Sequence, residues 1–491
     1  MTGPAEEMIN AGYALEIADA PLVHRGLTLA DLAHVLDLRS ARVIPREPAR
    51  QLLRLLLDIL DVPAEEFPYD PSHGEVYNSR ERYLAGRIGD AAGWLHAGRP
   101  RREAMRIAFR LHLRDVLAEL IGAAADLATQ LAELAGRHTE TWMADQTYLQ
   151  HAQPTTFGHY AVSFAYPVLR DGRRLADALA WVDASPGGAG GVNGTALLTD
   201  RSHIAELLGF GSVIEHTRDA MWQTDGLVDA LAASASLLIT QDKLAEDLEI
   251  WASHEFSYVT LTDGYSRSSV LMPQKRNPYA LTMIRGASGV AIGRLSGLLA
   301  VTKTPSARSD NLIFAYGEVP RALAAAVRTT WLSAGVVGTL QVHGERLWSV
   351  LEGSFAQAAD LAEHLMLACR LDYRSAYRIV GHAVRTAADQ GLRGVDIDAA
   401  ALDAAALAVL GRSLGVDGAA LSRALDPRKV VRTRTARGGA APAEVARMVA
   451  TCTDEAGDLS RQARMRQEHF RHAEQALIAA ARHAATPGTG Q

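Results

Sequence analysis

Cysteine is nearly absent from this chain, which contains only Cys369 and Cys452 among its 491 residues. Two cysteines cannot form a framework of several disulfide bonds, and their spacing does not match that of a metal-binding motif. A secreted, disulfide-stapled fold is therefore excluded. We expect a reducing compartment, with the cytoplasm as the default location, and two small buried thiol side chains.

Long apolar runs and an excess of basic residues are also missing. No segment reaches the ~18 apolar residues that a membrane-spanning helix needs, and residues 1–20 contain acidic side chains instead of a sustained apolar run. The formal net charge is −6, whereas a general nucleic-acid binder usually carries a basic domain or stripe. We therefore expect neither a membrane nor a nucleic acid as a partner. A hydrophobic content of 48% with 22% charged residues is ordinary for a soluble globular protein.

Runs of β-branched residues are scarce as well, whereas alanine, leucine and arginine are abundant, and this composition predicts an all-α fold. Three long helices are expected: one of about thirty residues starting near Glu103, one over 224–251 and one over 278–303. The first helix has an apolar seam at alternating spacings of four and three, formed by Leu113, Leu117, Leu120, Ala124, Leu127, Leu131 and Leu134. The third is rich in glycine and alanine, which permits close helix contacts. Together these helices predict a bundle.

The chain is long enough for about three domains. We predict an N-terminal, mostly helical domain over 1–110, a central helical bundle over 111–355 and a small helical C-terminal domain over 356–491. The long helices bear apolar surface on more than one face, so a lone protomer would expose much of it to water. We therefore expect several copies of the chain to associate.

The most informative segment is Ser-Ser-Val-Leu-Met-Pro-Gln-Lys-Arg-Asn-Pro at residues 268–278. Asn277 is predicted to cap a helix that begins at Pro278, because asparagine accepts from unpaired amides and proline suits the first helical position. The positive end of that helix and Lys275 favour a carboxylate ligand and reduce the cost of ionising Ser269. The segment therefore predicts a site that removes a proton next to a carboxylate.

This segment resembles the signature of the fumarase/aspartase superfamily, Gly-Ser-x-x-Met-x-x-Lys-x-Asn, with Ser268 in place of the glycine. Residues 95–103 (LHAGRPRRE) and 149–159 (LQHAQPTTFGH) resemble blocks of its argininosuccinate lyase branch, in the same order, and residues 185–201 resemble a fourth block more weakly. The resemblance implies a three-domain, all-α fold with a central long-helix bundle. It also implies a homotetramer whose active sites each draw on three chains.

The chemistry that the resemblance implies is anti elimination from an N-substituted succinate, without a metal or a cofactor. Ser269 stands six residues before Lys275, where the superfamily has its catalytic serine, and is expected to be the base. A serine is basic only when its alkoxide is stabilised, so a mobile loop containing Ser268 and Met272 must close over the substrate. Lys275 and Asn277 would then hold the carboxylate whose charge grows in the transition state.

Other blocks would supply the rest of the pocket. By resemblance, Thr147, Gln153 and Thr155 line the dicarboxylate pocket, and Arg101 makes a bidentate ion pair with a substrate carboxylate. The family reads Gly-Arg-Ser-Arg-Asn-Asp where this chain has Gly-Arg-Pro-Arg-Arg-Glu at residues 98–103. Arg102 therefore replaces a neutral group, and is either a substrate-binding cation, a surface residue or a partner of Glu103.

The proton donor to the leaving nitrogen stays open. The family usually has a histidine where Tyr148 stands and a paired glutamate where Thr282 stands, so both partners are replaced together. Tyr148 could donate through its hydroxyl, His151 or His159 could donate from nearby, or water could suffice. A lone histidine is more often a structural residue.

The leaving amine is the second open point. Argininosuccinate lyases tend to have a tyrosine where this chain has Arg308, and an arginine there would repel the guanidinium of an arginine product. We therefore expect an amine that itself bears an anion, as in the reaction of ethylenediamine-disuccinate lyases. Argininosuccinate lyase proper, a pathway-specific lyase on nitro- or hydrazino-succinate and an inactive structural homologue are the alternatives. Retention of Ser269, Lys275 and Asn277 argues against the last, and the physiological direction stays open.

Overall fold

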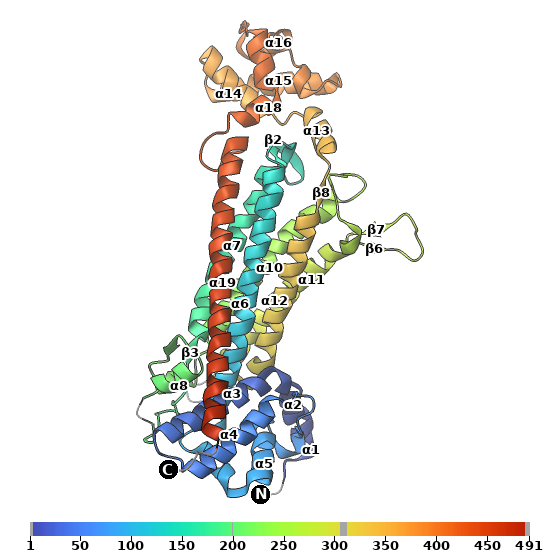
Figure 1. The fold of residues 1–491 in the computed structure, drawn as a ribbon. Coiled ribbons are helices and arrows are strands. Elements are labelled where there is room, and N and C mark those ends of the chain that lie inside the picture. The colour runs from blue at the N-terminus through green and yellow to red at the C-terminus, as the bar shows by residue number, and fades with distance from the viewer. Residues whose placement is uncertain (1–2, 199, 305–311, 487–491) are drawn as a thin grey trace.

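The computed structural model describes residues 3–198, 200–304 and 312–486. A long helical bundle has an N-terminal group of helices at one end and a small helical cluster at the other (Figure 1). The strands in the described part of the chain form four two-stranded sheets, which are short connections between helices. The predicted all-α fold is confirmed.

The N-terminal group consists of short helices around a buried polar centre. Tyr77 donates to Asp31 at 2.7 Å, and the guanidinium groups of Arg80 and Arg99 pair with the same carboxylate. Two buried cations thus share one carboxylate, and these hydrogen bonds anchor the segment that leads into the bundle. The elements are α1 (Glu6–Met8), η1 (Ile9–Tyr13), α2 (Ala14–Ala18), α3 (Ala20–Ser40), α4 (Arg46–Leu60), η2 (Pro71–His73), α5 (Val76–Ile88) and η3 (Gly89–His96).

In the part of the chain that the structure describes, six long helices form the bundle: α6 (Arg101–Arg137), α7 (Phe157–Val182), α10 (Asp225–Trp251), α11 (Tyr279–Thr302), α12 (Ile313–Thr339) and α19 (Pro442–Ala485). The three predicted helices correspond to α6, α10 and α11. Every residue of the predicted leucine and alanine seam of α6 is buried against its neighbours. The alternating spacing of four and three residues between apolar side chains therefore identified the face of α6 that packs in the core.

The packing of α11 differs from the expectation. Within the protomer, a Cβ at Gly286, Gly289, Gly293 or Gly297 would have no neighbour within 4 Å, so the stripe of small residues makes no close helix contact there. The helix is long and apolar enough to cross a membrane by length and composition alone, with 17% of its most apolar window buried, whereas no such segment was expected. Its apolar surface is left open on the outside of the bundle.

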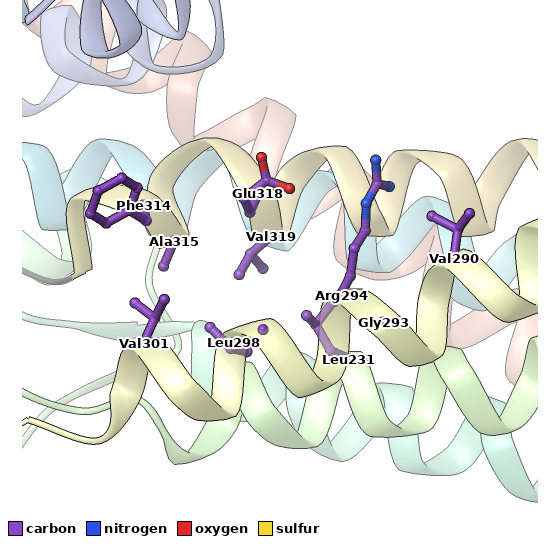
Figure 2. A pocket seen from close by; sticks show the side chains of 11 residues that line it. Leu231, Val290, Gly293, Arg294, Leu298, Val301, Phe314, Ala315, Glu318 and Val319 are labelled. Atoms are coloured by element: carbon purple, nitrogen blue, oxygen red, sulfur yellow. The ribbon is translucent and has the colours of Figure 1, made fainter. Parts of the chain in front are cut away.

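A cavity of about 430 Å³ lies between α11 and α12 on this open side, with Leu231 of α10 at its base. Figure 2 shows the aliphatic side chains of Val301, Leu298 and Val319 around it. Only Arg294 and Glu318 are charged among its lining residues, and none of the predicted site residues lines it. The cavity is a feature of the apolar helix surface and offers no arrangement for proton transfer.

Connections between the bundle helices carry the short strands: β1 (Trp142–Thr147), β2 (Gln150–Thr156), β3 (Ala184–Ser185), α8 (Ser202–Leu207), β4 (Ser212–Val213) and α9 (Thr217–Ala220), then β5 (Val259–Thr260), η4 (Asp263–Tyr265), β6 (Arg267–Ser268), β7 (Arg276–Asn277) and β8 (Gln341–Val342). β1 pairs with β2, β5 with β8 and β6 with β7 in antiparallel fashion, and β3 pairs with β4 in parallel. The β1–β2 and β6–β7 hairpins hold two of the predicted site blocks.

The small helical cluster contains α14 (Ala358–Cys369), α15 (Tyr373–Asp389), η6 (Gly394–Asp396), α16 (Ala399–Leu410), α17 (Gly418–Leu425) and α18 (Pro427–Arg432), and α13 (Gly344–Glu352) leads into it. It has a core of its own over residues 361–425. The prediction grouped the last helix with this cluster, but α19 packs in the main core along α6, because its apolar residues from Val445 to Ala485 face the bundle. The predicted boundary at residue 110 likewise lies inside α6.

Candidate active site

The signature segment forms the β6–β7 hairpin, whose tip spans residues 269–275 and projects away from the bundle (Figure 1). The Ser269 hydroxyl oxygen accepts backbone N–H groups from Leu271 at 3.3 Å and Met272 at 3.0 Å. The Lys275 amide closes the turn on the Met272 carbonyl at 3.0 Å, and the lysine side chain is exposed. Two amides directed at the serine oxygen are the arrangement that stabilises a developing alkoxide.

Asn277 does not cap the following helix, contrary to the prediction. Its side-chain nitrogen donates to the Arg267 carbonyl at 3.1 Å, across the hairpin. Pro278 occupies the cap position of α11, which has no side-chain cap. The reason is that residue 277 belongs to the β6–β7 ladder, so its side chain is directed across the strands and cannot reach the helix amides. Asn277 stabilises the base of the hairpin instead.

The second block forms the β1–β2 hairpin, with Tyr148 and Leu149 at its tip. Both residues have left-handed backbone conformations, with φ of 55° and 57°. Two consecutive left-handed residues suit the twist of a two-residue hairpin, but bulky side chains rarely adopt them and the strain costs of order 1–3 kcal/mol each. Tyr148 is 99% exposed. The strained turn therefore presents its phenol to the solvent, next to the exposed Thr147.

His151 and Gln153 are exposed on β2, whereas Thr155 is buried. The Thr155 hydroxyl lies 3.2 Å from Nδ1 of His159, whose Nε2 lies 3.0 Å from the Gly438 carbonyl oxygen. A carbonyl only accepts, so Nε2 carries the hydrogen and Nδ1 accepts from the threonine. These two bonds give His159 a structural role between β2 and the loop before α19.

The first block lies at the start of α6. Arg101 is exposed, pairs with Glu75 at 3.1 Å and donates to Asn78. Glu103 is buried and accepts from the amides of Gly188 at 2.8 Å and Gly190 at 2.6 Å. Burial raises the pKa of Glu103 to about 7. The glycine-rich fourth block therefore supplies hydrogen-bond partners of Glu103.

Glu16 was not anticipated from the sequence. Burial, and secondarily the nearby Glu75, raises its pKa to about 7, while the charges of Arg102 and Arg101 act in the opposite direction. Glu16 therefore belongs to the charged cluster around Arg101. The sequence gave no signal for this cluster, because Glu75 and Arg101 are far from Glu16 along the chain and come close to it only in the fold.

The three blocks do not meet within one protomer. α6 has 37 residues, which corresponds to about 55 Å at 1.5 Å per residue. Arg101 lies at its first turn, and the β1–β2 hairpin follows its last turn. In Figure 1 the start of α6 and the β2 hairpin lie at opposite ends of the bundle, and the β6–β7 hairpin projects sideways between them. Arg101 and Tyr148 of one chain cannot contact the same small molecule.

Comparison with known proteins finds relatives over most of the chain. Residues 33–293 match the model of a lyase family, and residues 355–432 match the model of the argininosuccinate lyase C-terminal region. Argininosuccinate lyase from Methanoculleus marisnigri is 34% identical over 429 residues, which cover 87% of this chain and 86% of that protein. The enzyme of the same name from Methanothermobacter thermautotrophicus is 32% identical, covering 84% of this chain and 88% of that protein.

The chain belongs to the argininosuccinate lyase family. It is a carbon–nitrogen lyase of the fumarase/aspartase superfamily that forms fumarate. Among solved structures, EDDS lyase in complex with formate has a TM-score of 0.87 at 25% identity, covering 99% of this chain and 97% of that chain. The class II fumarase of Schistosoma mansoni, at 13% identity and a TM-score of 0.71, shares the fold.

Two points about this lyase concern its ligands. Arg308, predicted to contact the leaving amine, lies outside the described residues. In the part of the chain that the structure describes, no group of three or more His, Cys, Asp or Glu side chains is arranged to hold a metal ion.

Proposed function

We propose that this lyase cleaves an N-substituted aspartate, whose amine portion carries a carboxylate or another anion, into fumarate and the free amine. The observation that carries the proposal is the Ser269 oxygen, which accepts two backbone amides six residues before Lys275. No other hydroxyl in the predicted site blocks has this environment within the described residues. The amides and the lysine together lower the cost of forming an alkoxide.

The reaction would proceed by anti elimination. The Ser269 alkoxide takes the proton from Cβ, and the electron pair of that C–H bond passes into the adjacent carboxylate. Lys275 and Asn277 hold this carboxylate while its charge grows. The pair then returns to form the double bond of fumarate as the C–N bond breaks, and the nitrogen takes a proton from Tyr148 or from water. Closure of the β6–β7 hairpin excludes water from the base.

The complete site would be assembled from several copies of the chain. The distance along α6 and the outward direction of the β6–β7 hairpin support this arrangement, because the blocks of one chain are separated by the length of the bundle. The apolar, exposed face of α11 supports self-association. We propose a homotetramer in which Arg101, Tyr148 and Ser269 of each site come from three different chains. The free thiols Cys369 and Cys452 agree with a cytoplasmic location.

An anionic leaving amine is supported by the cations of the first block. Arg101 is exposed at the start of α6, and Arg102 replaces a neutral residue of the family pattern. The likeness to EDDS lyase over 99% of the chain supports the same substrate class. We therefore propose an aminopolycarboxylate as the substrate. Argininosuccinate is the second candidate, which the 32–34% identity to the archaeal argininosuccinate lyases favours.

The test incubates the assembled protein with fumarate and a panel of amines, and identifies adducts by mass. The panel contains arginine, ethylenediamine and diamino acids with a free carboxylate. We expect the best rates with amines that retain an anionic group. If arginine is the best nucleophile by a wide margin, the substrate is argininosuccinate and the proposed anion preference is wrong.

The assigned base has its own test in the same assay. Ser269→Ala is expected to lower the rate by roughly 10²–10⁴-fold, the usual contribution of a general base. Ser266→Ala, in the same connection but before the hairpin, is the matched control and should retain the rate. A Ser269→Ala enzyme with full activity would remove Ser269 from the mechanism.

A further inference from the structure

A second charged cavity lies in the small helical cluster, apart from the predicted site blocks. It has a volume of about 460 Å³ and opens between α14, α17 and the segment from α18 to Arg434. Its α14 wall carries Asp360, Glu363 and His364, and the opposite elements carry Arg423, Lys429 and Arg434. We call this cavity the α14–α17 cleft. The carboxylates lie on α14 and the cations on the facing segments, and Arg434 pairs with Asp360 and, at 3.8 Å, with Glu363.

The α14 wall contains polar atoms whose bonding is incomplete. Asp360 is 9% exposed, and its Oδ1 pairs with Arg434. Asp360 Oδ2 and His364 Nε2 are buried and have no hydrogen-bond partner among residues 3–198, 200–304 and 312–486. A buried carboxylate oxygen without a donor costs free energy that a bound donor would recover. These two groups stand one helical turn apart and line the same cleft.

The basic wall is available for an anion. Arg423 and Lys429 are exposed, and Lys429 lies 3.8 Å from Asp426, which is a weak surface contact. Leu367, Ala424 and Val430 form apolar surface between the charged groups. A ligand of a few carbon atoms with opposite charges at its ends matches this distribution, and the volume lies within the usual range for small-molecule pockets.

We propose that the α14–α17 cleft binds a small zwitterion, an amino acid or a similar amino carboxylate. A small side-chain movement would open Asp360 Oδ2 to the cleft, so that the ammonium group of the ligand donates to it while the ligand carboxylate accepts from Arg423 and Lys429. None of the residues of the three site blocks lines this cleft. The proposed binding is therefore separate from the elimination reaction and does not depend on which amine the enzyme releases.

The experiment is isothermal titration of the assembled, full-length protein with glycine, arginine, aspartate and ornithine, and with acetate and methylammonium as probes of one charge. We expect at least one amino acid to bind more tightly than either single-charge probe. Arg423→Gln with Lys429→Gln should weaken that binding by roughly tenfold or more, because two charge-assisted bonds are lost. These two side chains are exposed, so the variant should fold, and thermal unfolding verifies it.

Two controls separate the cleft from other sites. Arg374→Gln removes an exposed cation of α15 outside the cleft, and binding should be unchanged. Arg101→Ala alters the predicted active site, and binding should also persist. The proposal is overturned if no amino acid binds, if acetate binds as tightly as the amino acids, if the cleft variant binds normally, or if Arg101→Ala abolishes binding. Asp360→Asn gives an independent check, since it should abolish the preference for a ligand with an ammonium group.

Discussion

At the residue scale, backbone strain and burial identify functional candidates that composition could not. Tyr148 and Leu149 both have positive φ, although neither is glycine or asparagine. Strain of this kind is retained only where the surroundings enforce it, and it often accompanies function. Here it places a phenol at the tip of the β1–β2 hairpin, at the position where the family usually has a histidine. The unusual turn therefore presents the residue that we propose as the proton donor.

Tyr148→Phe tests this role. The substitution keeps the ring and the left-handed backbone and removes only the hydroxyl, so kcat should fall by roughly 10²–10⁴-fold if Tyr148 protonates the leaving nitrogen. Steady-state fumarate release and thermal unfolding are the measurements. Tyr377→Phe, another exposed tyrosine outside the site blocks, should leave both unchanged. A normal kcat in Tyr148→Phe would assign the proton to water or His151.

Glu16 makes a prediction about pH and stability. Its pKa is raised from 4.5 to about 7 in the folded protein, so the folded state binds more protons than the unfolded state between these values. Stability therefore falls as pH rises through this window and levels off above about 7. Glu16→Gln removes this dependence. The Tm of the variant minus the Tm of the wild type should therefore increase as the pH rises from 4.5 to 7.

The exposed Glu7 of α1 provides the control for this measurement. Glu7→Gln should leave the pH profile of the Tm unchanged in the same interval. If Glu16→Gln follows the wild-type profile at every pH, the carboxyl does not carry the raised pKa in the assembled protein.

At the scale of elements, polar residues within apolar seams define how helices pair. Gln241 of α10 is buried, donates to the Thr330 hydroxyl at 2.9 Å and accepts from the Ser333 hydroxyl at 2.7 Å. Both partners lie on α12. Because a buried amide needs partners on both sides, this contact favours one register of α10 against α12 over neighbouring ones.

Gln241→Leu should therefore destabilise the bundle by about 1–3 kcal/mol, since hydroxyl groups on α12 would lose their partners. Denaturant unfolding of the purified protein measures the change. Gln462→Leu, at an exposed position of α19, should change stability by less than about 0.5 kcal/mol. Equal effects of the two substitutions would mean that the α10–α12 hydrogen bonds contribute no specific stability.

At the scale of the whole molecule, the length of the bundle determines how an active site can form. A helix of 37 residues separates the first block from the second, and the signature hairpin points away from both (Figure 1). The exposed apolar face of α11 offers the surface on which copies would associate. An enzyme with this geometry would have its residues distributed among subunits, and a single copy would be inactive.

Co-expression of two inactive variants tests the shared site. Arg101→Ala and Ser269→Ala should each be nearly inactive, but mixed assemblies should recover part of the rate, because some sites would draw an intact Arg101 and an intact Ser269 from different chains. Different affinity tags on the two variants allow purification of the mixed species, and fumarate release measures the recovery.

The matched control combines Lys275→Ala with Ser269→Ala. Both residues belong to the same hairpin, so every hairpin in a mixed assembly lacks either Ser269 or Lys275. No recovery is therefore expected. Recovery in this control, or none with Arg101→Ala, would contradict sites that combine the two ends of the bundle.

Three bundle helices of the described residues, α6, α10 and α11, could be predicted from the sequence. The spacing of apolar residues depends only on the helical period, so the seam of α6 and the limits of α10 were read within one or two residues. The motif residues Ser269 and Lys275 were likewise recognisable, because their segment resembles the signature of the superfamily. Their assigned roles stay predictions until the variants are measured.

Local sequence patterns could not predict the contacts between segments that are distant along the chain. Asn277 was expected at a helix cap but bonds across a hairpin, Glu103 binds the glycine loop, and α19 returns to the bundle instead of packing with the small cluster. Each outcome depends on which surfaces meet after the chain has folded back on itself. Local periodicity and propensity therefore determined the elements and the candidate chemistry of this lyase, while only the tertiary structure decided which groups satisfy one another, because that choice rests on long-range packing and burial.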